Sequence, residues 1–227
     1  MNSRYLVKEV FASVQGEGVW TGKSMIFLRF GGCNLRCPYC DTAWLGGTRY
    51  SEDDLIAEVK GAQEDAYLSI KSDLKHKINT VCLTGGEPLL QCLPLVPRLK
   101  AEGFFVHIET NGTIPLPRPE SDGIDWVSCA PKEGEPLVLE HASEVKVVTA
   151  AGQHPFMGPH DRPFPRINAP HWFLQPMNKA SKKNEERVGQ ENCNDIDWPA
   201  LRWCILYVKH HPTWRLSPQL QKFLKVR

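Results

Sequence analysis

The sequence predicts an α/β protein built on a parallel sheet, with its strands and helices arranged as a partial β/α barrel. Short apolar runs rich in β-branched residues recur along the 227 residues, each bounded by glycine, proline or polar residues. These runs are continuous rather than alternating, which is typical of strands buried on both faces. Stretches with helical spacing separate several runs, and such alternation favours a parallel sheet. About six strands are expected, fewer than the eight of a closed barrel, so the barrel is incomplete.

Each element follows from a local signal. The expected strands are, in chain order, Met25–Phe30, Thr80–Leu83, Phe104–Ile108, Trp126–Cys129, Glu144–Val148 and Trp172–Leu174. A first helix begins after the capping residue Ser51 and continues with apolar residues at helical spacing to Ala62. A second covers Leu93–Glu102 and ends at Gly103, a residue that favours helix ends. A third covers Trp198–Lys209 and has a proline in its first turn.

Composition and charge limit the class of protein. The chain suits a single domain over residues 1–227, and its net charge of +1 gives no electrostatic footprint for nucleic acid. The basic residues Lys222, Lys225 and Arg227 are interpreted as a solvated tail. No apolar run approaches the ~20 residues of a membrane helix, and the first residues lack the apolar core of a signal peptide. We therefore expect a cytoplasmic protein that binds neither nucleic acid nor membrane.

Three cysteines in one short loop are the strongest functional signal. Cys33, Cys37 and Cys40 have the spacing C-x3-C-x2-C and supply three thiolates, whereas an iron–sulfur cluster normally takes four. Three ligands leave one iron of a cubane cluster open, as radical enzymes need in order to bind S-adenosylmethionine (SAM). A zinc site would need a fourth ligand, typically from a second pair. The other cysteines are scattered singly and are expected in the core: Cys82, Cys92, Cys129, Cys193 and Cys204.

Polar or glycine-rich motifs follow five of the expected strands. Ligands of parallel α/β folds bind at the carboxyl ends of the strands. The five motifs are therefore expected to meet at one mouth. In chain order they are Cys33–Thr42, Thr84–Pro88, Glu109–Gly112, Ala130–Lys132 and Gln175–Asn178.

Several side chains near these motifs have a functional and an ordinary interpretation. Glu87, after paired glycines, offers a carboxylate to an amine such as that of SAM, although the glycine pair alone indicates only a turn. Arg29 lies inside an apolar run, where an unpartnered arginine is rare, and its guanidinium suits a carboxylate. Thr42 offers Mg²⁺ a hydroxyl oxygen, with helix capping as the alternative. Lys132 and Lys146 are either surface lysines or site residues.

Together these motifs resemble the 7-carboxy-7-deazaguanine synthases, a family of radical SAM enzymes. The resemblance rests on VQGEG, IFLRFGGCNLRCPYCDT, TGGEP, IETNGT, FLQPM and the ending WRLSPQLQKFLKVR, and it covers nearly the whole chain. It implies conversion of 6-carboxy-5,6,7,8-tetrahydropterin to 7-carboxy-7-deazaguanine with loss of ammonia, in the queuosine and deazapurine pathway. It also implies a partial barrel of the radical SAM type, a [4Fe–4S] cluster, SAM, Mg²⁺, a homodimer and an electron donor such as flavodoxin.

The resemblance assigns roles position by position. Cys33, Cys37 and Cys40 are the expected cluster ligands, and Thr42 is the expected Mg²⁺ ligand. The expected SAM contacts are Tyr39, Asp41, Gly86, Glu87, Glu109, Ala130, Pro131, Lys132, Gln175, Pro176, Met177 and Asn178. The expected substrate contacts are Val14, Gln15, Gly16, Glu17, Arg29, Thr84, Gln221 and the terminal carboxylate of Arg227, with Arg29 and Glu17 also assigned as catalytic.

Two positions depart from the family pattern. Gln221 stands where the family usually has histidine, so this side chain cannot become cationic. Ala130 stands where the family has serine, and one hydroxyl is lost. The first departure bears on substrate binding and the second on contacts to SAM.

Two other functions stay open from the sequence. Another radical SAM enzyme, such as a glycyl-radical activase, shares the cysteine loop but does not need a pterin-binding arginine, and it would show a docking surface for a large partner. A non-catalytic iron–sulfur or zinc module would show a fourth protein ligand and would not bind SAM.

Overall fold

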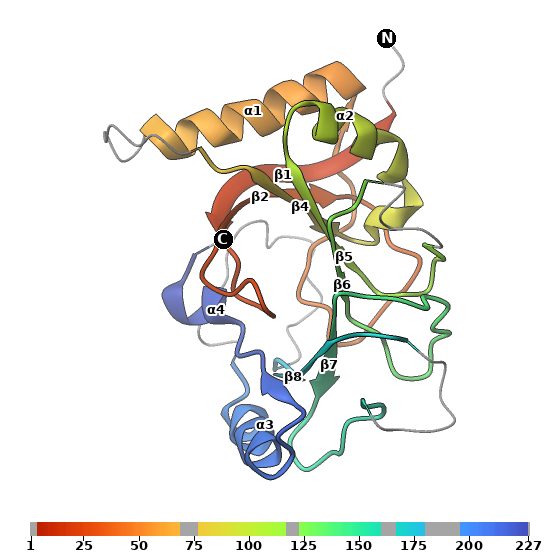
Figure 1. The fold of residues 1–227 in the computed structure, drawn as a ribbon, viewed down its shortest axis with the longest axis vertical. Helices are drawn as coiled ribbons and strands as arrows, with labels where there is room; N and C mark the ends of the chain where they lie inside the picture. Colours follow the sequence, from red (N-terminus) through yellow and green to blue (C-terminus); the bar gives the residue numbers. More distant parts are fainter. Residues whose placement is uncertain (1–3, 69–76, 117–122, 160–166, 180–195, 227) are drawn as a thin grey trace.

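The computed structural model describes residues 4–68, 77–116, 123–159, 167–179 and 196–226. The strands are β1 (Tyr5–Val14), β2 (Ser24–Phe30), β3 (Thr48–Tyr50), β4 (Thr80–Gly85), β5 (Phe105–Thr110), β6 (Trp126–Cys129), β7 (Glu144–Thr149), β8 (His171–Pro176) and β9 (Arg215–Leu216). The helices are α1 (Glu52–Leu68), α2 (Val96–Ala101), α3 (Trp198–His210) and α4 (Leu220–Leu224), with two short 3-10 turns, η1 (Pro88–Leu90) and η2 (Leu93–Leu95). Figure 1 shows a curved sheet with α1 and α2 on its outer side.

The strands in the described part of the chain form one sheet, in the order β3-β1-β2-β4-β5-β6-β7-β8-β9. From β2 to β9 every neighbouring pair is parallel, whereas β1 and β3 are antiparallel at one edge. The sheet keeps two free ends, so the predicted partial barrel is confirmed, as are all six predicted strands. The strands β1, β3 and β9 were not expected. β1 carries Lys8 and Glu9 in its middle and therefore lacks a continuous apolar run.

Side chains alternate between the two faces of each strand, and this alternation separates the core from the inner face of the sheet. On β2, β4, β5 and β7 the outward residues include Leu28, Leu83, Ile108 and Val147, which share one hydrophobic cluster with residues of α1 and α2. Several inward residues of the same strands and of β8 are polar and line one cavity: Arg29, Thr84, Glu109, Lys146 and Gln175. The inner face of the half-barrel is therefore the surface that can receive a ligand.

The three expected helices are confirmed, with small shifts at their ends. At α1 the amide of Asp54 donates to the hydroxyl of Ser51 at 3.2 Å, which is the predicted cap. The second predicted helix is divided into η2 and α2. At α3 the carboxylate of Asp197 accepts from the amide of Ala200 at 2.9 Å. None of the helices in the described ranges is long and apolar enough to cross a membrane.

The C-terminal segment closes the open side of the half-barrel. The amide of Leu220 donates to the carbonyl of Gly16 at 2.8 Å, so α4 lies beside the loop that follows β1, as Figure 1 shows. Lys222 is only 2% exposed and pairs with Asp41 at 2.7 Å. The interpretation of this ending as a solvated tail is therefore wrong for Lys222, because the fold places an acid from a distant loop against it.

Candidate active site

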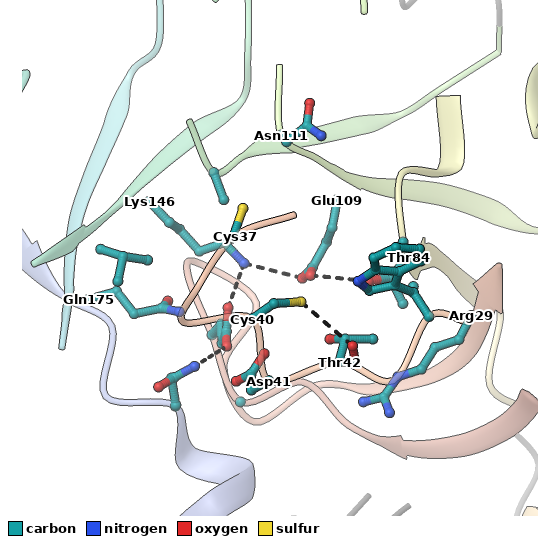
Figure 2. Close-up of a pocket in the computed structure, with 18 of the residues that line it drawn as sticks. Arg29, Cys37, Cys40, Asp41, Thr42, Thr84, Glu109, Asn111, Lys146 and Gln175 are labelled. Carbon is teal, nitrogen blue, oxygen red and sulfur yellow. Dashed lines mark hydrogen bonds and ion pairs between the residues drawn. The ribbon is translucent and has the colours of Figure 1, made fainter. Parts of the chain in front are cut away.

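A cavity of about 210 Å³ lies on the inner face of the sheet, at the carboxyl ends of the parallel strands. Its walls are the loop after β1, the cysteine loop after β2, the ends of β4 to β8 and the C-terminal segment. All five strand-end motifs contribute to it, so the predicted single mouth is confirmed. In Figure 2, Lys146 and Glu109 project from strands toward the loop that carries Cys37 and Cys40.

Cys33, Cys37 and Cys40 all line the cavity, and they are the only cysteines among the described residues that do so. None of the three is in a disulfide. A structural zinc ion takes four ligands, whereas a cubane cluster with one open iron takes three thiolates from the protein. The donor set therefore fits the cluster.

Glycines after β4 allow the cysteine loop to lie close to the sheet. The amide of Glu87 donates to the carbonyl of Gly32 at 3.0 Å, and a Cβ atom on Gly86 would collide with that same carbonyl oxygen. Only glycine permits so close an approach of two backbones. The turn after β4 thus supports the start of the cysteine loop.

Glu87 lies beneath this turn and does not line the cavity. It is fully buried, and its carboxylate accepts hydrogen bonds from the amide of Leu89 (3.1 Å), the hydroxyl of Thr110 (2.8 Å) and the amide of Asn111 (2.8 Å). Burial raises the pKa of Glu87, and these hydrogen bonds oppose the shift. These hydrogen bonds join the ends of β4 and β5. The sequence had instead predicted a direct contact between the Glu87 carboxylate and an amine of the ligand.

A buried cation joins two carboxylates of the cavity. The Nζ atom of Lys146 lies 2.7 Å from Glu17 and 3.3 Å from Glu109. Burial alone would raise the pKa of Glu17, but the Lys146 ammonium, together with the hydrogen bond from Gln219 and the charge of Lys222, outweighs burial and lowers this pKa to about 2. Burial would lower the pKa of Lys146, but Glu109 and Glu17 together raise it. Both partners are therefore charged at neutral pH, and Lys146 is not a surface lysine.

Amide side chains complete the surroundings of these carboxylates. Gln15 donates to Glu109 at 2.9 Å. Gln219 and Gln221 both donate to Oε1 of Glu17, at 3.0 and 3.1 Å. Because both of these glutamines belong to the C-terminal segment, Glu17 connects that segment to the loop after β1.

Arg29 lies across the cavity from Lys146 (Figure 2). Its Nη1 atom is 2.8 Å from Glu9 on β1, and its guanidinium carbon is 5.1 Å from the ring centre of Phe11. Phe11 and Phe27 stack with ring centres 5.4 Å apart, and both line the cavity. This wall combines an oriented cation with aromatic surface, which suits a flat ligand that carries a carboxylate.

Asp41 connects the cysteine loop to two distant segments. Its Oδ2 atom accepts hydrogen bonds from Asn178, after β8, at 2.9 Å and from Lys222, in α4, at 2.7 Å. The position of the cysteine loop is therefore coupled to that of the C-terminal segment.

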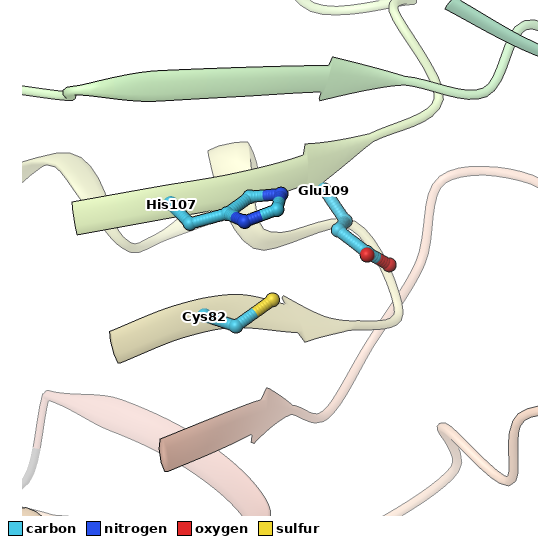
Figure 3. A group of neighbouring side chains, drawn as sticks. All are labelled: Cys82, His107 and Glu109. Carbon is cyan, nitrogen blue, oxygen red and sulfur yellow. The ribbon is translucent and has the colours of Figure 1, made fainter. Parts of the chain in front are cut away.

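Cys82, His107 and Glu109 form a group of neighbouring ligand-type atoms, all within 4.8 Å of one another (Figure 3). His107 is fully buried, and neither ring nitrogen has a partner among the described residues. Burial, together with the charge of Lys146, lowers the pKa of His107 to about 3. The Lys146 ammonium already supplies the positive charge beside Glu109. We therefore interpret Cys82, His107 and Glu109 as interior residues of the half-barrel and not as a metal site.

The chain is similar to known proteins in sequence and in fold. Residues 28–156 match the model of the Radical SAM superfamily. A 7-carboxy-7-deazaguanine synthase from Bacteroides thetaiotaomicron is 39% identical over 222 residues, covering 97% of this chain and 98% of the relative. Another, from Bradyrhizobium diazoefficiens, is 35% identical over 240 residues, covering 98% and 99%. The chain belongs to the 7-carboxy-7-deazaguanine synthase family.

The crystal structure of QueE from Escherichia coli has a similar fold, with a TM-score of 0.57 and 26% identity over 93% of this chain and 92% of that chain. The family resemblance and the fold class expected from the sequence are thus confirmed. Membership of the radical SAM superfamily implies a [4Fe–4S] cluster and SAM, in agreement with the three thiols of the cavity.

Most residues that the family resemblance assigned to the site line the cavity. They are Val14, Gln15, Gly16, Glu17, Arg29, Cys33, Cys37, Tyr39, Cys40, Asp41, Thr42, Thr84, Gly86, Glu109, Ala130, Lys132, Gln175, Pro176, Asn178 and Gln221. Pro131 and Met177, like Glu87, do not line it. Arg227, assigned through its terminal carboxylate, lies outside the described residues, as does Cys193.

Other cavity residues were not assigned from the sequence. They include Phe11, Phe27, Thr110, Asn111, Lys146 and Gln219. Lys146 had a detectable signal, because it lies between Val145 and Val147 in an apolar run, like Arg29 in its own run. The aromatic residues and Gln219 gave none, since only the fold brings them to the cavity.

Proposed function

We propose that this chain converts 6-carboxy-5,6,7,8-tetrahydropterin to 7-carboxy-7-deazaguanine with loss of ammonia, in the deazapurine pathway that leads to queuosine in tRNA. Curated relatives that carry the name of this synthase align over nearly the whole chain. The observation that carries the proposal is a single cavity in which three thiols face an arginine and two carboxylates. A substrate with a carboxylate and N–H donors suits that distribution of charge.

The cofactor side of the cavity is assigned to the cysteine loop and the strand ends. Cys33, Cys37 and Cys40 would bind the cluster, and neighbouring residues would contact SAM: Tyr39, Asp41, Gly86, Glu109, Ala130, Lys132, Gln175, Pro176 and Asn178. When bound, the cluster and SAM would supply the radical chemistry that the conversion of the substrate needs. The amides of Gln175 and Asn178 can donate and accept hydrogen bonds, which would fix the orientation of a polar cofactor.

Substrate recognition is assigned to Arg29 and Glu17. The guanidinium of Arg29, held by Glu9, would pair with the pterin carboxylate. Glu17 would accept hydrogen bonds from N–H groups of the ring, and the Phe11 and Phe27 side chains would contact its flat face. A substrate fixed at both ends would keep its reacting carbon close to the radical source.

Mg²⁺ is assigned to Thr42. This residue lines the cavity directly after the cluster ligands, and a hydroxyl oxygen is a ligand of the type that Mg²⁺ accepts. Asp41, beside it, pairs with Lys222, so the substrate carboxylate would have to supply negative charge to the ion.

The partner assignments follow from the surface and the chemistry. On α3 the exposed residues Trp198, Ile205 and Leu206 lie on one helical face, and Trp198 contacts Phe223 of α4 with ring centres 5.9 Å apart. We assign this apolar surface to a homodimer interface, which light scattering can test. An electron donor such as flavodoxin would reduce the cluster, and we place the reaction in the cytoplasm, where thiols stay reduced.

The decisive experiment is an anaerobic turnover assay. The reconstituted protein would be supplied with SAM, Mg²⁺, a reductant and 6-carboxytetrahydropterin, and the product would be followed by mass and ultraviolet absorbance. Formation of 7-carboxy-7-deazaguanine supports the proposal and shows that Gln221 is tolerated. Cleavage of SAM without a deazapurine product would contradict the substrate assignment while preserving the radical chemistry.

A further inference from the structure

Lys146 lies deeper than the two acids it contacts. It is in the middle of β7, with its side chain 3% exposed, whereas the side chains of Glu17 and Glu109 are 14% and 24% exposed. All three line the cavity, and Figure 2 shows the Lys146 side chain directed at Glu109. The carboxylates are thus the accessible groups, and the ammonium supports them from the more buried side.

Fold stability alone gives little reason for this lysine. Removing an ammonium group from water is costly, and replacing a buried ion pair by apolar side chains is often neutral or stabilising. Phe173 is the register partner of Lys146 on the neighbouring strand, and Val148 follows on the same face of β7. The strand neighbours of Lys146 are thus apolar, and among the described residues its ammonium contacts only the two acids Glu17 and Glu109, so the whole charged group calls for a functional reason.

Charges from several elements act on Glu17, and Lys146 is the nearest cation to it. Lys146 is at 2.7 Å, and the charge of Lys222 in α4 acts in the same direction. The negative charge of Asp41, next to Cys40, acts in the opposite direction. Glu109 and Glu144 are further negative charges, and both act on Lys146. The Cys82 thiol on β4 is another titratable neighbour of Glu17. Gln15, Gln219 and Gln221 are neutral. Without the Lys146 ammonium, burial and the surrounding acids would favour the protonated form of Glu17.

We propose that Lys146 is a positioning residue for substrate binding: its buried ammonium holds Glu17 as a charged acceptor directed at a ring edge that carries N–H donors. The identity of that ring, the amino-pyrimidinone edge of a pterin, rests on the proposed function, whereas the action of Lys146 on Glu17 does not. Three donors already reach Glu17, and a carboxylate offers about four acceptor positions. A ring with two N–H donors would therefore fill the last position and displace one C-terminal glutamine.

Kinetics against pH test this proposal in the holoenzyme. The measured quantity is the KM of the Lys146→Met variant for the pterin divided by the KM of the wild type. This ratio is expected to rise about tenfold when the pH is lowered from about 8 to about 6. The reason is that a buried carboxylate without its cation can have a pKa several units higher. Lys146→Gln keeps a hydrogen-bond donor without the charge and is expected to show the same rise, so the test also stands if the methionine variant folds poorly. Lys100→Met breaks an ion pair with Asp125 on the outer surface and is expected to leave the ratio constant.

A direct titration of Glu17 provides a readout independent of activity. The full-length chain, labelled with carbon-13 at the glutamate carboxyls and with an oxidised cluster, would be followed by NMR, and Glu17→Gln would identify the resonance. We expect no titration of Glu17 between about pH 8 and about pH 5 in the wild type or in Glu109→Gln, and a clear one in both Lys146 variants.

The outcomes separate the two proposals. An unshifted Glu17 titration in the Lys146 variants, or a loss of binding that is the same at every pH, would show that Lys146 has only a structural role. If the wild type makes no deazaguanine, the proposed function fails, but the carbon-13 titration still decides the action of Lys146 on Glu17.

Discussion

The cysteine loop and the carboxylate–lysine group of Glu17, Lys146 and Glu109 face each other across one cavity but are built in different ways. The three cysteines come from eight consecutive residues, Cys33–Cys40, and their loop has little regular structure. The carboxylate–lysine group draws Glu17 from the loop after β1, Glu109 from β5 and Lys146 from β7. The loop presents ligands for an external group, whereas the carboxylate–lysine group is already satisfied by its own ion pairs.

Under the proposed function, this difference separates the source of reactivity from the source of recognition. A local loop can bind a cluster on any scaffold that leaves it space, because the cluster brings its own chemistry. A group assembled from three distant segments exists only in the folded sheet, and its charges are fixed before a ligand arrives. Variants of the loop are therefore expected to abolish the radical chemistry, and variants of the group to change which ligand is bound and how tightly.

The largest expected effect is at the cysteine loop. Cys33→Ala removes one of three cluster ligands, so the iron–sulfur absorbance and all product formation are expected to be lost. Cys204→Ala is the matched control: Cys204 is buried in α3, away from the cavity, and its variant is expected to keep cluster and activity while losing about 1 kcal/mol of stability. Normal turnover by Cys33→Ala would contradict the cluster assignment.

An intermediate effect is expected at Glu17. Glu17→Gln keeps the shape of the side chain but removes a charged acceptor, and kcat/KM is expected to fall roughly 10- to 100-fold, the equivalent of one charge-assisted hydrogen bond. Reductive cleavage of SAM without substrate is expected to continue at the wild-type rate. The comparison fails if cluster content and SAM cleavage fall together with kcat/KM, since recognition and reactivity would then not be separable.

A smaller effect is expected where the two regions are linked, at the pair of Lys222 and Asp41. Lys222→Met is expected to change the free energy of unfolding by less than about 1 kcal/mol, because methionine fills the buried volume and Asp41 stays partly hydrated. Turnover is expected to fall by roughly tenfold, since α4 is no longer tied to the cysteine loop. Lys225→Met, on the exposed side of the same segment, is expected to leave both quantities unchanged. Equal effects of Lys222→Met and Lys225→Met would contradict a functional link between α4 and the cysteine loop.

The smallest effect on catalysis is expected at His107. This residue is expected to affect the pH dependence of the free energy of unfolding. Its pKa is lowered to about 3 in the folded state, so below about pH 6.5 only the unfolded chain takes up this proton and stability falls by about 1 kcal/mol per pH unit. Above about pH 6.5 this contribution is complete and constant. His107→Leu is expected to flatten the slope between about pH 6.5 and 5, measured by urea unfolding. An unchanged slope, with the exposed His210→Gln as control, would contradict the assignment.

The sequence was sufficient where a signal is local. Continuous apolar runs predicted the parallel strands, and the cysteine spacing predicted three thiols that line one cavity. It was insufficient where a residue acts through a distant partner: Lys222 resembles any basic residue of a tail until Asp41 is placed against it. Glu87 shows the opposite case, because its position in the glycine motif suggested a ligand contact, whereas the fold directs its carboxylate to Thr110 and Asn111.

Lys146 marks the boundary between the two cases. Its place in an apolar strand was visible in the sequence, but the alternation of faces along that strand could not name its partners. Glu17 lies 129 residues away in the chain, and a separation of that size carries no local pattern. The reasoning that identified Arg29, a charged residue inside an apolar strand of a parallel sheet, would also have identified Lys146 as a cavity residue.

The most direct test is an anaerobic crystal structure of the holoenzyme with SAM and 6-carboxytetrahydropterin. We expect the ring N–H donors to lie within hydrogen-bond distance of Glu17, the substrate carboxylate to lie beside Arg29, and the ion pair between Lys146 and Glu17 to be kept. A substrate bound elsewhere, or in this cavity with Glu17 still contacted only by Lys146, Gln219 and Gln221, would contradict the division between a reactive loop and a recognising carboxylate–lysine group.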